Sequence, residues 1–239
     1  MQTSNNHVLI TGGSSGIGLA LAKKFLATNN EVTIVGRNGA KLTAVKEKHP
    51  QLKIATADLT NRESLQQLVR QCPNINVLIN NAGVQYEYQF ADAATPVAQI
   101  DMELDTNSNG LFHLTKLYLP HLLQQPTAAI VNVSSALGIV PKESAPIYCA
   151  SKAAVHVFTK SLRWQLEDSS VKVFEIIPPL VDTAMTNGRS ANKISPEKLV
   201  AEFWQGWQKD QFEMRIGRVK QLFFLNRLAP KLAERMMRA

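Results

Sequence analysis

Short hydrophobic runs alternate along this chain with segments in which apolar residues recur every three or four positions. The runs lie at residues 7–11, 31–36, 53–59, 77–79, 129–134, 171–179 and 212–216. Short, nearly continuous apolar runs predict strands that are buried on both faces, and the segments between them predict amphipathic helices. Strands that alternate with helices indicate a parallel sheet with helices on both sides. We therefore predict an α/β fold with a doubly wound parallel sheet in one domain.

The first predicted strand leads directly into a glycine-rich turn and a helix. Residues 12–18 read Gly-Gly-Ser-Ser-Gly-Ile-Gly, and residues 19–26 have helical periodicity. Glycines let the backbone approach a pyrophosphate, and a helix N-terminus offers unpaired N–H groups and the positive end of a dipole. This predicts a dinucleotide site, with a glycine turn that binds no ligand as the alternative. A nucleoside triphosphatase loop is excluded, because Leu19 and Ala20 stand where Lys and Ser or Thr would follow Gly18.

The end of the second predicted strand bears on the choice between NAD and NADP. An acidic residue about twenty positions beyond the glycines would bind the ribose 2′-hydroxyl of NAD. This chain has Gly36 there, followed by Arg37. A guanidinium binds a 2′-phosphate through two charge-assisted hydrogen bonds, whereas a carboxylate would repel it. We therefore predict NADP(H); the alternative is that Arg37 is only a solvated loop charge.

A possible acid/base pair lies in the segment 135–152. Tyr148 and Lys152 are four positions apart, so on a helix the ammonium lies beside the phenol. Ser135 follows the run 129–134, which as a parallel strand carries its hydroxyl to the sheet edge where such folds bind ligands. We expect Lys152 and a cationic nicotinamide ring to lower the tyrosine pKa from about 10, although proton donation in a reduction needs no such change. Alone, Tyr-x-x-x-Lys also fits a half-buried tyrosine and a solvated lysine.

Taken together, these segments resemble the short-chain dehydrogenase/reductase family. The shared motifs are Thr-Gly-x-x-x-Gly-x-Gly from Thr11, Asn-Asn-Ala-Gly at 80–83, Ser135 and Tyr148-x-x-x-Lys152, in the family's order. The resemblance implies a Rossmann fold and reversible hydride transfer between NADP(H) and a small carbonyl or alcohol substrate. It implies that Ser135 hydrogen-bonds the carbonyl oxygen, that Tyr148 exchanges the proton, and that Lys152 binds the nicotinamide ribose. It also implies a homodimer formed through the helices around Asn107 and Tyr148.

The same resemblance assigns further site residues. Asn107 corresponds to an asparagine that distorts a helix and holds a water for a proton relay; the alternative is a merely tolerated helix residue. Asp58 would accept from the adenine amino group, and a role for Asp58 or Thr60 as a helix N-cap is compatible with this. The cofactor-binding residues that the resemblance implies are Gly12, Ser14, Ser15, Gly16, Ile17, Gly18, Arg37, Asp58, Leu59, Asn81, Ala82, Gly83, Tyr148, Lys152, Pro178, Val181 and Thr183.

One position departs from the family pattern, and the C-terminal end is atypical. Pro179 replaces a glycine, which removes an N–H donor and fixes φ, so we expect a nicotinamide loop of different shape. The segment Pro-Pro-x-Val-Asp-Thr at 178–183 and the basic tail resemble a narrower branch, the short-chain oxidoreductases encoded near bacterial lipoteichoic acid D-alanylation genes. Family members often end instead in a glycine-rich strand.

We predict a dehydrogenase domain at residues 1–217 and an amphipathic basic extension at 218–239. Ser195 and Pro196 predict the start of a helix, and segment 182–210 is predicted to fold over the substrate as a lid, with Trp204 and Trp207 in the core or an interface. In the extension, apolar and basic residues recur on different helical faces, and Pro230 predicts two short helices. We expect it to pack on its own domain or on a dimer mate; a helix on an anionic membrane surface is the alternative.

Composition narrows the classes of function. The 239 residues carry a formal charge of +7, of which +5 lies after residue 210, and the body has no basic stripe with stacking aromatics, so we predict no nucleic-acid partner. Cys72 and Cys149 give neither a disulfide framework nor a metal spacing, which fits a reducing cytoplasm and predicts no metal. No apolar run or leader indicates a membrane span or secretion. The rival function is an NADP-binding sensor or scaffold with little turnover.

Overall fold

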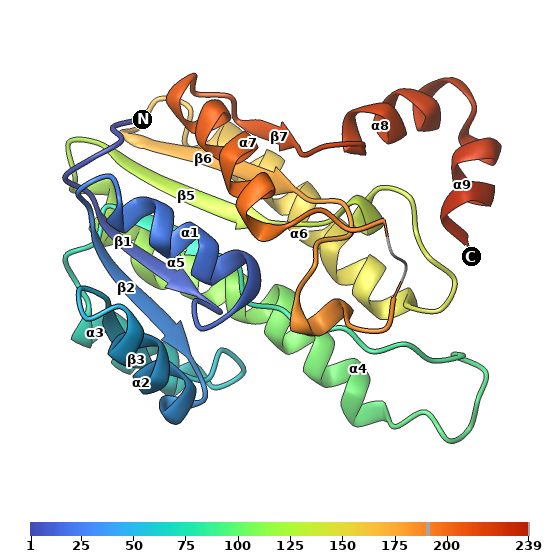
Figure 1. Ribbon diagram of the computed structural model, residues 1–239, viewed down its shortest axis with the longest axis horizontal. Coiled ribbons are helices and arrows are strands. Elements are labelled where there is room, and N and C mark those ends of the chain that lie inside the picture. The colour runs from blue at the N-terminus through green and yellow to red at the C-terminus, as the bar shows by residue number, and fades with distance from the viewer. Residues whose placement is uncertain (190–191, 239) are drawn as a thin grey trace.

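A parallel sheet forms the centre of the molecule (Figure 1). The structure is a computed structural model and describes residues 1–189 and 192–238. Within them the strands are β1 (His7–Thr11), β2 (Glu31–Gly36), β3 (Lys53–Thr56), β4 (Val77–Asn80), β5 (Ala128–Val133), β6 (Val171–Ile177) and β7 (Glu213–Arg215). Their order is β3-β2-β1-β4-β5-β6-β7, and every neighbouring pair is parallel. The predicted doubly wound Rossmann fold is therefore confirmed.

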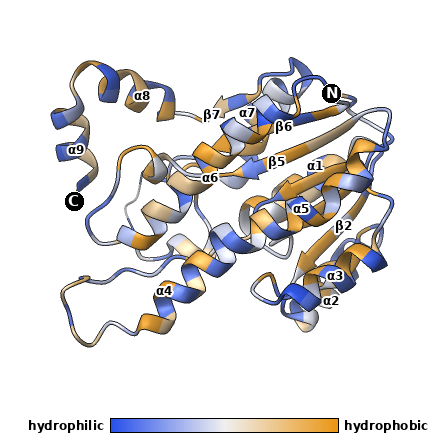
Figure 2. Ribbon diagram, turned by 180° about the vertical axis from the view of Figure 1, so that it is seen from behind, coloured by the Kyte–Doolittle hydropathy of each residue, from blue (hydrophilic) through white to orange (hydrophobic). Residues whose placement is uncertain are grey.

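Helices cover both faces of this sheet. They are α1 (Gly16–Leu26), α2 (Gly39–Lys48), α3 (Arg62–Gln71), α4 (Val97–Leu104), α5 (Gly110–Leu123), α6 (Pro146–Gln165), α7 (Pro196–Gln208), α8 (Val219–Leu228) and α9 (Pro230–Arg238). Val8 and Ile10 of β1 pack in the core shared with α1, α2 and α7, whereas Leu9 packs with α3, α5 and α6. Because successive strand side chains point to opposite faces, both faces need apolar residues, and Figure 2 shows the strands coloured mainly as hydrophobic.

The strand order reverses between β1 and β4, and this reversal positions the site. The chain leaves β1 for β2 and β3 on one side, then crosses to β4 on the other side of β1. The loops that follow β1 and β4 therefore diverge at the carboxyl edge of the sheet, where doubly wound folds bind their ligands. All of the predicted strands exist, but the third ends at Thr56 rather than Leu59. Asp58 Oδ1 instead accepts from both the N–H and the hydroxyl of Thr60, and Asn61 is the N-cap of α3, not Asp58 or Thr60.

The helix around Asn107 is distorted, as predicted. A π-helical turn, Asp105–Asn109, joins α4 to α5. π turns are rare and are often found at functional sites. Gly110 follows the turn, and a Cβ there would lie 2.7 Å from the Leu59 carbonyl oxygen. Only glycine therefore lets this helix approach the end of the β3 loop so closely.

The segment that we predicted as a lid divides into two parts. Ser195 caps α7 by accepting from the Lys198 N–H, as expected. The α7 side chains Phe203 and Trp207 are fully buried and stack around Phe25 of α1, with ring centroids 5.6 to 6.2 Å from it. This aromatic half is therefore part of the core. The part before it borders the site, and residues 190–191 lie outside the described residues.

The C-terminal extension forms α8 and α9, which break at Pro230 as predicted and project from the end of the sheet beyond β7 (Figure 1). Val219 at its start is buried against Ile177 and Ala136. At the far end, Arg238 Nε lies 2.6 Å from Glu143 Oε2, in the loop before α6. Phe224 and Leu228 remain about two-thirds exposed, at 67% and 66%. No described helix is both long enough and apolar enough to cross a membrane.

Candidate active site

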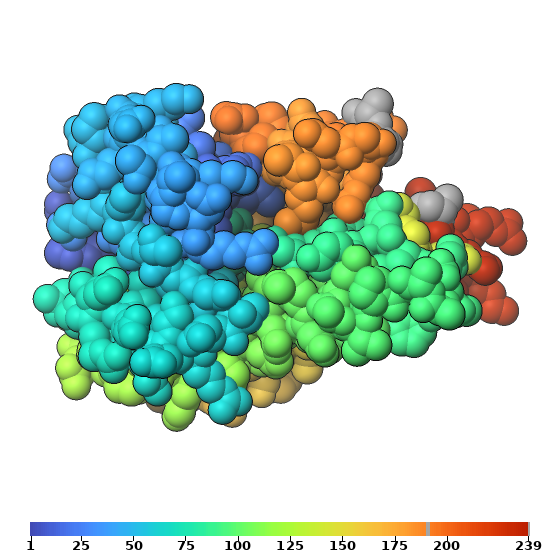
Figure 3. Space-filling view, turned by 90° about the horizontal axis from the view of Figure 1, so that it is seen from below, coloured from blue at the N-terminus to red at the C-terminus, as the bar shows by residue number. Residues whose placement is uncertain are grey.

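A cavity of about 1380 Å³ lies at the carboxyl edge of the sheet. The loops after β1, β2, β3, β4, β5 and β6 line it, and Figure 3 shows this side of the molecule hollowed between the N-terminal residues in blue and the residues after β6 in orange. Every residue that we predicted for catalysis or cofactor binding lines the cavity except Gly18 and Asn107. Parallel strands end at the same edge, which is why residues so distant in sequence meet there.

The glycine turn leaves room where side chains would fill the cavity. Gly12 and Gly16 have positive φ, +65° and +53°, and a Cβ would lie 2.9 Å from Ala82 Cα in the first case and 2.9 Å from Thr183 Cγ2 in the second. Gly18 has a different task, because its Cβ would lie 2.3 Å from the Gly12 carbonyl oxygen. It lets α1 pack closely against the turn. Ser15, the N-cap of α1, makes no capping hydrogen bond, so the first N–H groups of the helix remain available to an anion.

Asn81 holds two strand ends together. Its Nδ2 donates to the Thr11 carbonyl at 2.9 Å, and Thr11 Oγ1 accepts from the N–H groups of Asn81 and Ala82 at 3.0 and 3.1 Å. Below it, Asn80 Nδ2 donates to Thr115 and to Asn132 of β5. These bonds fix the relative positions of the two loops that follow β1 and β4. Our reading of the sequence missed Thr11, although a threonine at the end of a buried strand was a usable signal.

Two cations lie at the end of the cavity next to β2. Arg37 is exposed and lines the cavity, and its Nη1 lies 3.8 Å from Met102 Sδ. Within the described residues, no carboxylate forms an ion pair with it. Lys41, in the first turn of α2, and the α2 N-cap Asn38 line the same end, and the sequence reasoning missed both. Lys41 follows Arg37 by four positions, at the start of α2. This spacing in the sequence could have identified Lys41 as a second cation for the same site.

The proposed acid/base residues meet at the opposite end of the cavity. Tyr148 and Lys152 lie on α6, and Ser135 follows β5. The Ser135 hydroxyl lies close enough to the Tyr148 phenol to oppose the rise in its pKa, and its Oγ accepts from the Leu137 N–H at 3.1 Å. Lys152 is buried, its Nζ donates to the Val133 carbonyl at 2.9 Å, and it lies 5.8 Å from the centre of the Tyr148 ring. The three side chains therefore share one end of the cavity, as the resemblance implied.

The pKa values of the pair move in directions that the sequence did not reveal. Burial raises the Tyr148 pKa to about 12, although the Ser135 hydroxyl and the charge of Arg189 oppose this. Burial lowers the Lys152 pKa to about 8. In the ligand-free chain desolvation disfavours both charged forms and outweighs the groups that favour the phenolate, and the expected lowering of the tyrosine pKa by Lys152 and a bound nicotinamide ring stays a prediction. At neutral pH the phenol keeps its proton and is poised as an acid.

Asn107 lies behind the cavity wall rather than on it. Its Oδ1 accepts from the Val84 N–H at 2.8 Å, and its Nδ2 donates to the Val84 carbonyl at 2.9 Å and to Ser151 Oγ at 3.1 Å. A Cβ on Gly83 would lie 3.2 Å from Asn107 Oδ1 and 3.6 Å from Lys152 Nζ. Asn107 thus fixes the β4 loop beside the lysine. Its role in a water relay stays a prediction.

Two prolines follow β6, which ends at Ile177, and the expectation that Pro179 changes the shape of the nicotinamide loop stays a prediction. The Ala136 N–H donates to the Pro178 carbonyl, and Pro179, which has no N–H, lines the cavity. Val181 forms a parallel bridge with Ile194, and Thr186 Oγ1 donates to the Val181 carbonyl at 2.6 Å. These bonds hold Val181 and Thr183 against the glycine turn.

Residues far from the recognised motifs complete the catalytic end of the cavity. They are Gln85, Glu87, Lys142 and Arg189 from the loops after β4, β5 and β6, and Leu222, Leu225, Met236 and Met237 from the extension. The extension therefore forms part of the cavity wall, which agrees with our expectation that it packs on its own domain. Within residues 1–189 and 192–238, no group of three or more His, Cys, Asp or Glu side chains could hold a metal ion.

Comparison with known proteins adds independent information. The sequence profile of the family described as short chain dehydrogenase matches residues 6–194. A Bacillus subtilis (strain 168) protein described as the uncharacterized oxidoreductase DltE is 42% identical over 233 residues, which cover 93% of this chain and 92% of that protein. Its name supports the narrower resemblance to the branch associated with D-alanylation genes.

Solved structures resemble the whole chain. A short chain dehydrogenase from Burkholderia cenocepacia J2315, in complex with NADP, has a TM-score of 0.90 at 25% identity and covers 99% of each chain. A short-chain dehydrogenase from Sphingobium yanoikuyae, in complex with NADPH, has a TM-score of 0.80 at 27% identity and covers 87% of this chain and 86% of that one. The first match extends over nearly the full length, including the region of α8 and α9.

Proposed function

The chain belongs to the short chain dehydrogenase family, and from that membership we propose that it is an oxidoreductase that transfers a hydride between NADP(H) and a carbonyl or alcohol substrate. One observation carries the proposal: Ser135, Tyr148 and Lys152 line the same cavity as the glycine turn. A proton donor and a nucleotide cradle in one cavity are what a carbonyl reduction requires.

The residues present fit NADP(H). Gly12 and Gly16 leave the space that a pyrophosphate needs, and the uncapped first turn of α1 faces the cavity. Arg37 and Lys41 supply two cationic donors for a 2′-phosphate, and no aspartate or glutamate stands at the end of β2 to bind a 2′-hydroxyl. The complexes of the Burkholderia and Sphingobium proteins with NADP and NADPH support the same choice.

When bound, NADPH supplies the hydride that reduces the carbonyl carbon. Ser135 would hydrogen-bond the carbonyl oxygen and hold it beside the phenol. Tyr148, protonated at neutral pH because burial raises its pKa to about 12, would donate its proton to that oxygen. Lys152, with a pKa of about 8, is mostly an ammonium at neutral pH and would hold the nicotinamide ribose. Asn107 keeps the β4 loop beside this lysine.

The protonated Tyr148 phenol is in the form that a reduction uses. A phenol that keeps its proton is ready to act as an acid, whereas alcohol oxidation needs the phenolate as a base. The rival function, a binding protein with little turnover, needs the cradle but has no use for a proton-donating phenol beside Ser135 and Lys152 in the same cavity. The homodimer and the cytoplasmic location stay predictions.

The first test is thermal melting with NADPH and with NADH, followed by NADPH oxidation with a panel of ketones and aldehydes. A ligand that binds only the native state raises the free energy of unfolding by RT ln(1 + [L]/Kd). We expect a larger rise in Tm with NADPH than with NADH, and carbonyl-dependent loss of NADPH absorbance. Stabilisation without turnover of any carbonyl would favour the sensor instead.

A further inference from the structure

A compact set of charged and polar side chains lies beside Tyr148 at the catalytic end of the cavity. Arg189 Nε lies 3.2 Å from Glu87 Oε1, and Lys142 Nζ lies 3.3 Å from the same oxygen. Arg189 Nη1 also donates to Gln85 Oε1 at 2.5 Å. The four residues come from the three loops that carry Gly83, Ser135 and Thr183, and all four line the cavity.

The cations outnumber the carboxylate in this set. Two positive side chains share one oxygen of Glu87, which leaves a formal charge of +1. Arg189 and Lys142 are mostly shielded from solvent, with side-chain exposures of 19% and 26%, whereas Glu87 is 37% exposed. Arg189 is also close enough to favour the ionised form of Tyr148. Glu103, which accepts from the Tyr86 N–H and the Tyr88 hydroxyl, acts on Tyr148 in the opposite sense but has no described ion pair with this set, so the set itself carries the positive charge.

Gln85 supplies a second, independent observation. Its Oε1 accepts from Arg189, while its Nε2 is buried and has no hydrogen-bond partner among the described residues. A buried donor without an acceptor costs free energy, so an amide left in this state indicates an acceptor that arrives with a ligand. The donors of Gln85, Arg189 and Lys142 together match the several acceptor positions of a carboxylate.

We propose that Arg189, Lys142 and Gln85 bind a carboxylate on the substrate, which makes the substrate class oxo acids and the corresponding hydroxy acids. The inference rests on the proposed function. In the reduction, the carbonyl carbon gains the hydride from NADPH, the carbonyl oxygen gains the proton of Tyr148, and the products are a hydroxy acid and NADP⁺. The substrate carboxylate takes no part in this step and serves to orient the carbonyl.

Glu87 occupies the cations in the ligand-free protein. The incoming carboxylate must displace this side chain or share the two cations with it, so Glu87 weakens anion binding. Its exposure permits such a movement, because no other described hydrogen bond or ion pair than those to Lys142 and Arg189 holds its carboxylate. Leu222 and Leu225 line the same cavity, so the rest of the acid meets an apolar wall.

The cations at the opposite end of the cavity are not placed to bind the substrate carboxylate. Arg37 and Lys41 follow β2 and lie where the proposed cofactor phosphate would be bound, whereas Arg189 is the cation that influences the pKa of Tyr148. The competing explanation for Arg189 and Lys142 is a latch that only ties the loops together through Glu87. A latch stabilises the loops equally for charged and neutral substrates, and this difference makes the two explanations separable.

The test uses pyruvate, acetoacetate and levulinate, each beside its neutral amide, because the distance between carbonyl and carboxylate is unknown. NADPH oxidation gives kcat/KM, and melting of the protein with NADP⁺ and each compound gives binding without turnover. We expect at least one acid to exceed its amide by about tenfold or more. Arg189→Met should lower kcat/KM for that acid by about 10- to 100-fold and for its amide by less than about threefold, as expected for hydrogen bonds to a charged group.

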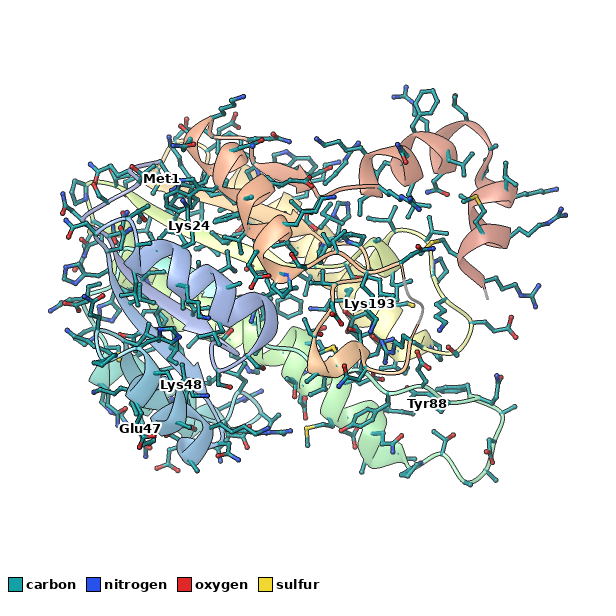
Figure 4. The ribbon with its side chains drawn as sticks, in the orientation of Figure 1. Met1, Lys24, Glu47, Lys48, Tyr88 and Lys193 are labelled. Carbon is teal, nitrogen blue, oxygen red and sulfur yellow. The ribbon has the colours of Figure 1, made fainter. Side chains whose placement is uncertain are left out.

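Companion variants sharpen the result. Lys142→Met should reduce the preference for the acid by a smaller factor, and Glu87→Gln should lower the KM for the acid by removing the internal competitor. Lys48→Met is the matched control, because Lys48 lies on α2, far from the Tyr88 loop in Figure 4, and its loss also removes one positive charge. It should leave the preference unchanged.

Three outcomes separate the hypotheses. Equal kcat/KM and equal melting shifts for acids and amides would overturn the carboxylate site while leaving the oxidoreductase in place. An equal loss with both compounds in Arg189→Met would show a latch, and would also overturn the site. Absence of turnover with every carbonyl, together with Arg189-dependent stabilisation by an acid, would support the carboxylate site and refute the proposed reaction.

Discussion

The two ends of the cavity each hold a pair of cations, but their surroundings differ. Next to β2, Arg37 Nη1 lies 3.8 Å from Met102 Sδ, and no described carboxylate forms an ion pair with it. Beside Tyr148, Arg189 and Lys142 share the Glu87 carboxylate. An uncompensated pair binds an anion without competition, whereas a compensated pair binds one only at the expense of the internal ion pair. The same residue types therefore suit a tightly held cofactor at one end and an exchanging substrate at the other.

The two ends also differ in how the chain builds them. The β2 end is lined by residues of the loops that directly follow strands β1, β2 and β3. The catalytic end combines Ser135, which follows β5 closely, with loop residues such as Gln85 and Arg189, 104 positions apart, and with α8 and α9. Strand ends are fixed by the sheet, whereas loops and terminal helices depend on their own contacts. We expect the second end to tolerate change more readily.

The largest expected effect is the loss of turnover, without loss of NADPH binding, when Tyr148 is replaced. Tyr148→Phe removes the proton donor and should lower kcat by about 10²- to 10⁴-fold, the range for one general acid. The rise in Tm with NADPH should persist, since neither cation pair changes. Turnover within tenfold of the parent would remove Tyr148 from the proposed mechanism.

A second prediction concerns the buried charge at the catalytic end. The Lys152 pKa is about 8 in the folded chain against an ordinary value of 10.5, so above about pH 8 the unfolded state retains a proton that the native state has lost. The free energy of unfolding should therefore rise with pH in this range, by about 2 kcal/mol between about pH 8 and about pH 10. Denaturant titrations of the parent and of Lys152→Met measure it.

The test compares how the free energy of unfolding changes with pH in the parent and in Lys152→Met. Lys152→Met should lack the rise, because it has no group there to titrate. Parallel pH profiles of parent and variant would show that the buried ammonium is not desolvated, and the catalytic end would then resemble the exposed β2 end. Tyr148 and the two cysteines, whose pKa values burial raises, contribute in the opposite direction as their unfolded forms ionise between about pH 8 and about pH 10, but these contributions are common to parent and variant and cancel in the difference.

A third prediction concerns Arg37 and Lys41, the two cations next to β2 that have no described carboxylate partner. Arg37→Gln removes a donor for the 2′-phosphate and should weaken NADPH binding by about 10- to 100-fold, with little change for NADH, as expected for one charge-assisted contact. Lys41→Gln should act in the same direction with a smaller effect. Melting titrations with both cofactors give the ratio. An equal loss with NADPH and NADH would mean that Arg37 does not read the phosphate.

The smallest expected effect concerns the clasp, the ion pair between Arg238 of the extension and Glu143 of the dehydrogenase domain. Arg238→Gln breaks the exposed ion pair with Glu143, which should change the KM of a carbonyl substrate by no more than about threefold, because surface pairs contribute little. Deleting residues 218–239 removes a wall of the cavity and should raise KM much further. Equal effects of the two changes would mean that the clasp alone positions the wall.

The fold and most of the site could be predicted from the sequence, for a local reason. Strands β1 and β2 match their apolar runs residue for residue, and the glycine turn follows β1 immediately. The glycine turn, Asn-Asn-Ala-Gly and Ser135 follow strand ends, and a parallel sheet brings such ends together whatever their separation in sequence, while Tyr148 and Lys152 share one face of α6. The π turn at Asn107 and the break at Pro230 were also predictable, because asparagine, glycine and proline disfavour regular helix within their own turn.

Contacts between distant loops could not be predicted in this way. No pattern in the sequence links Arg189 to Gln85 or Lys142 to Glu87, because loop residues carry no periodicity. Lys41 was missed although it lies in a regular helix, since its role depends on how α2 sits over the end of β2. The contribution of the extension to the cavity wall was likewise invisible in its amphipathic pattern, which fits several partners equally well.

The sequence by itself determined the parallel sheet, the nucleotide cradle and the identity of the acid/base residues, because these depend on strand ends and on helical spacing. Only the tertiary structure decided how those residues behave. Lys152 loses part of its affinity for a proton because the elements packed around it exclude water, and the half-buried Tyr148 keeps its proton because its surroundings disfavour the phenolate. Lys152 also directs its ammonium to the Val133 carbonyl, an acceptor that α6 reaches only when packed on β5. Desolvation and hydrogen-bond partners depend on what lies across the site, which a linear sequence does not specify.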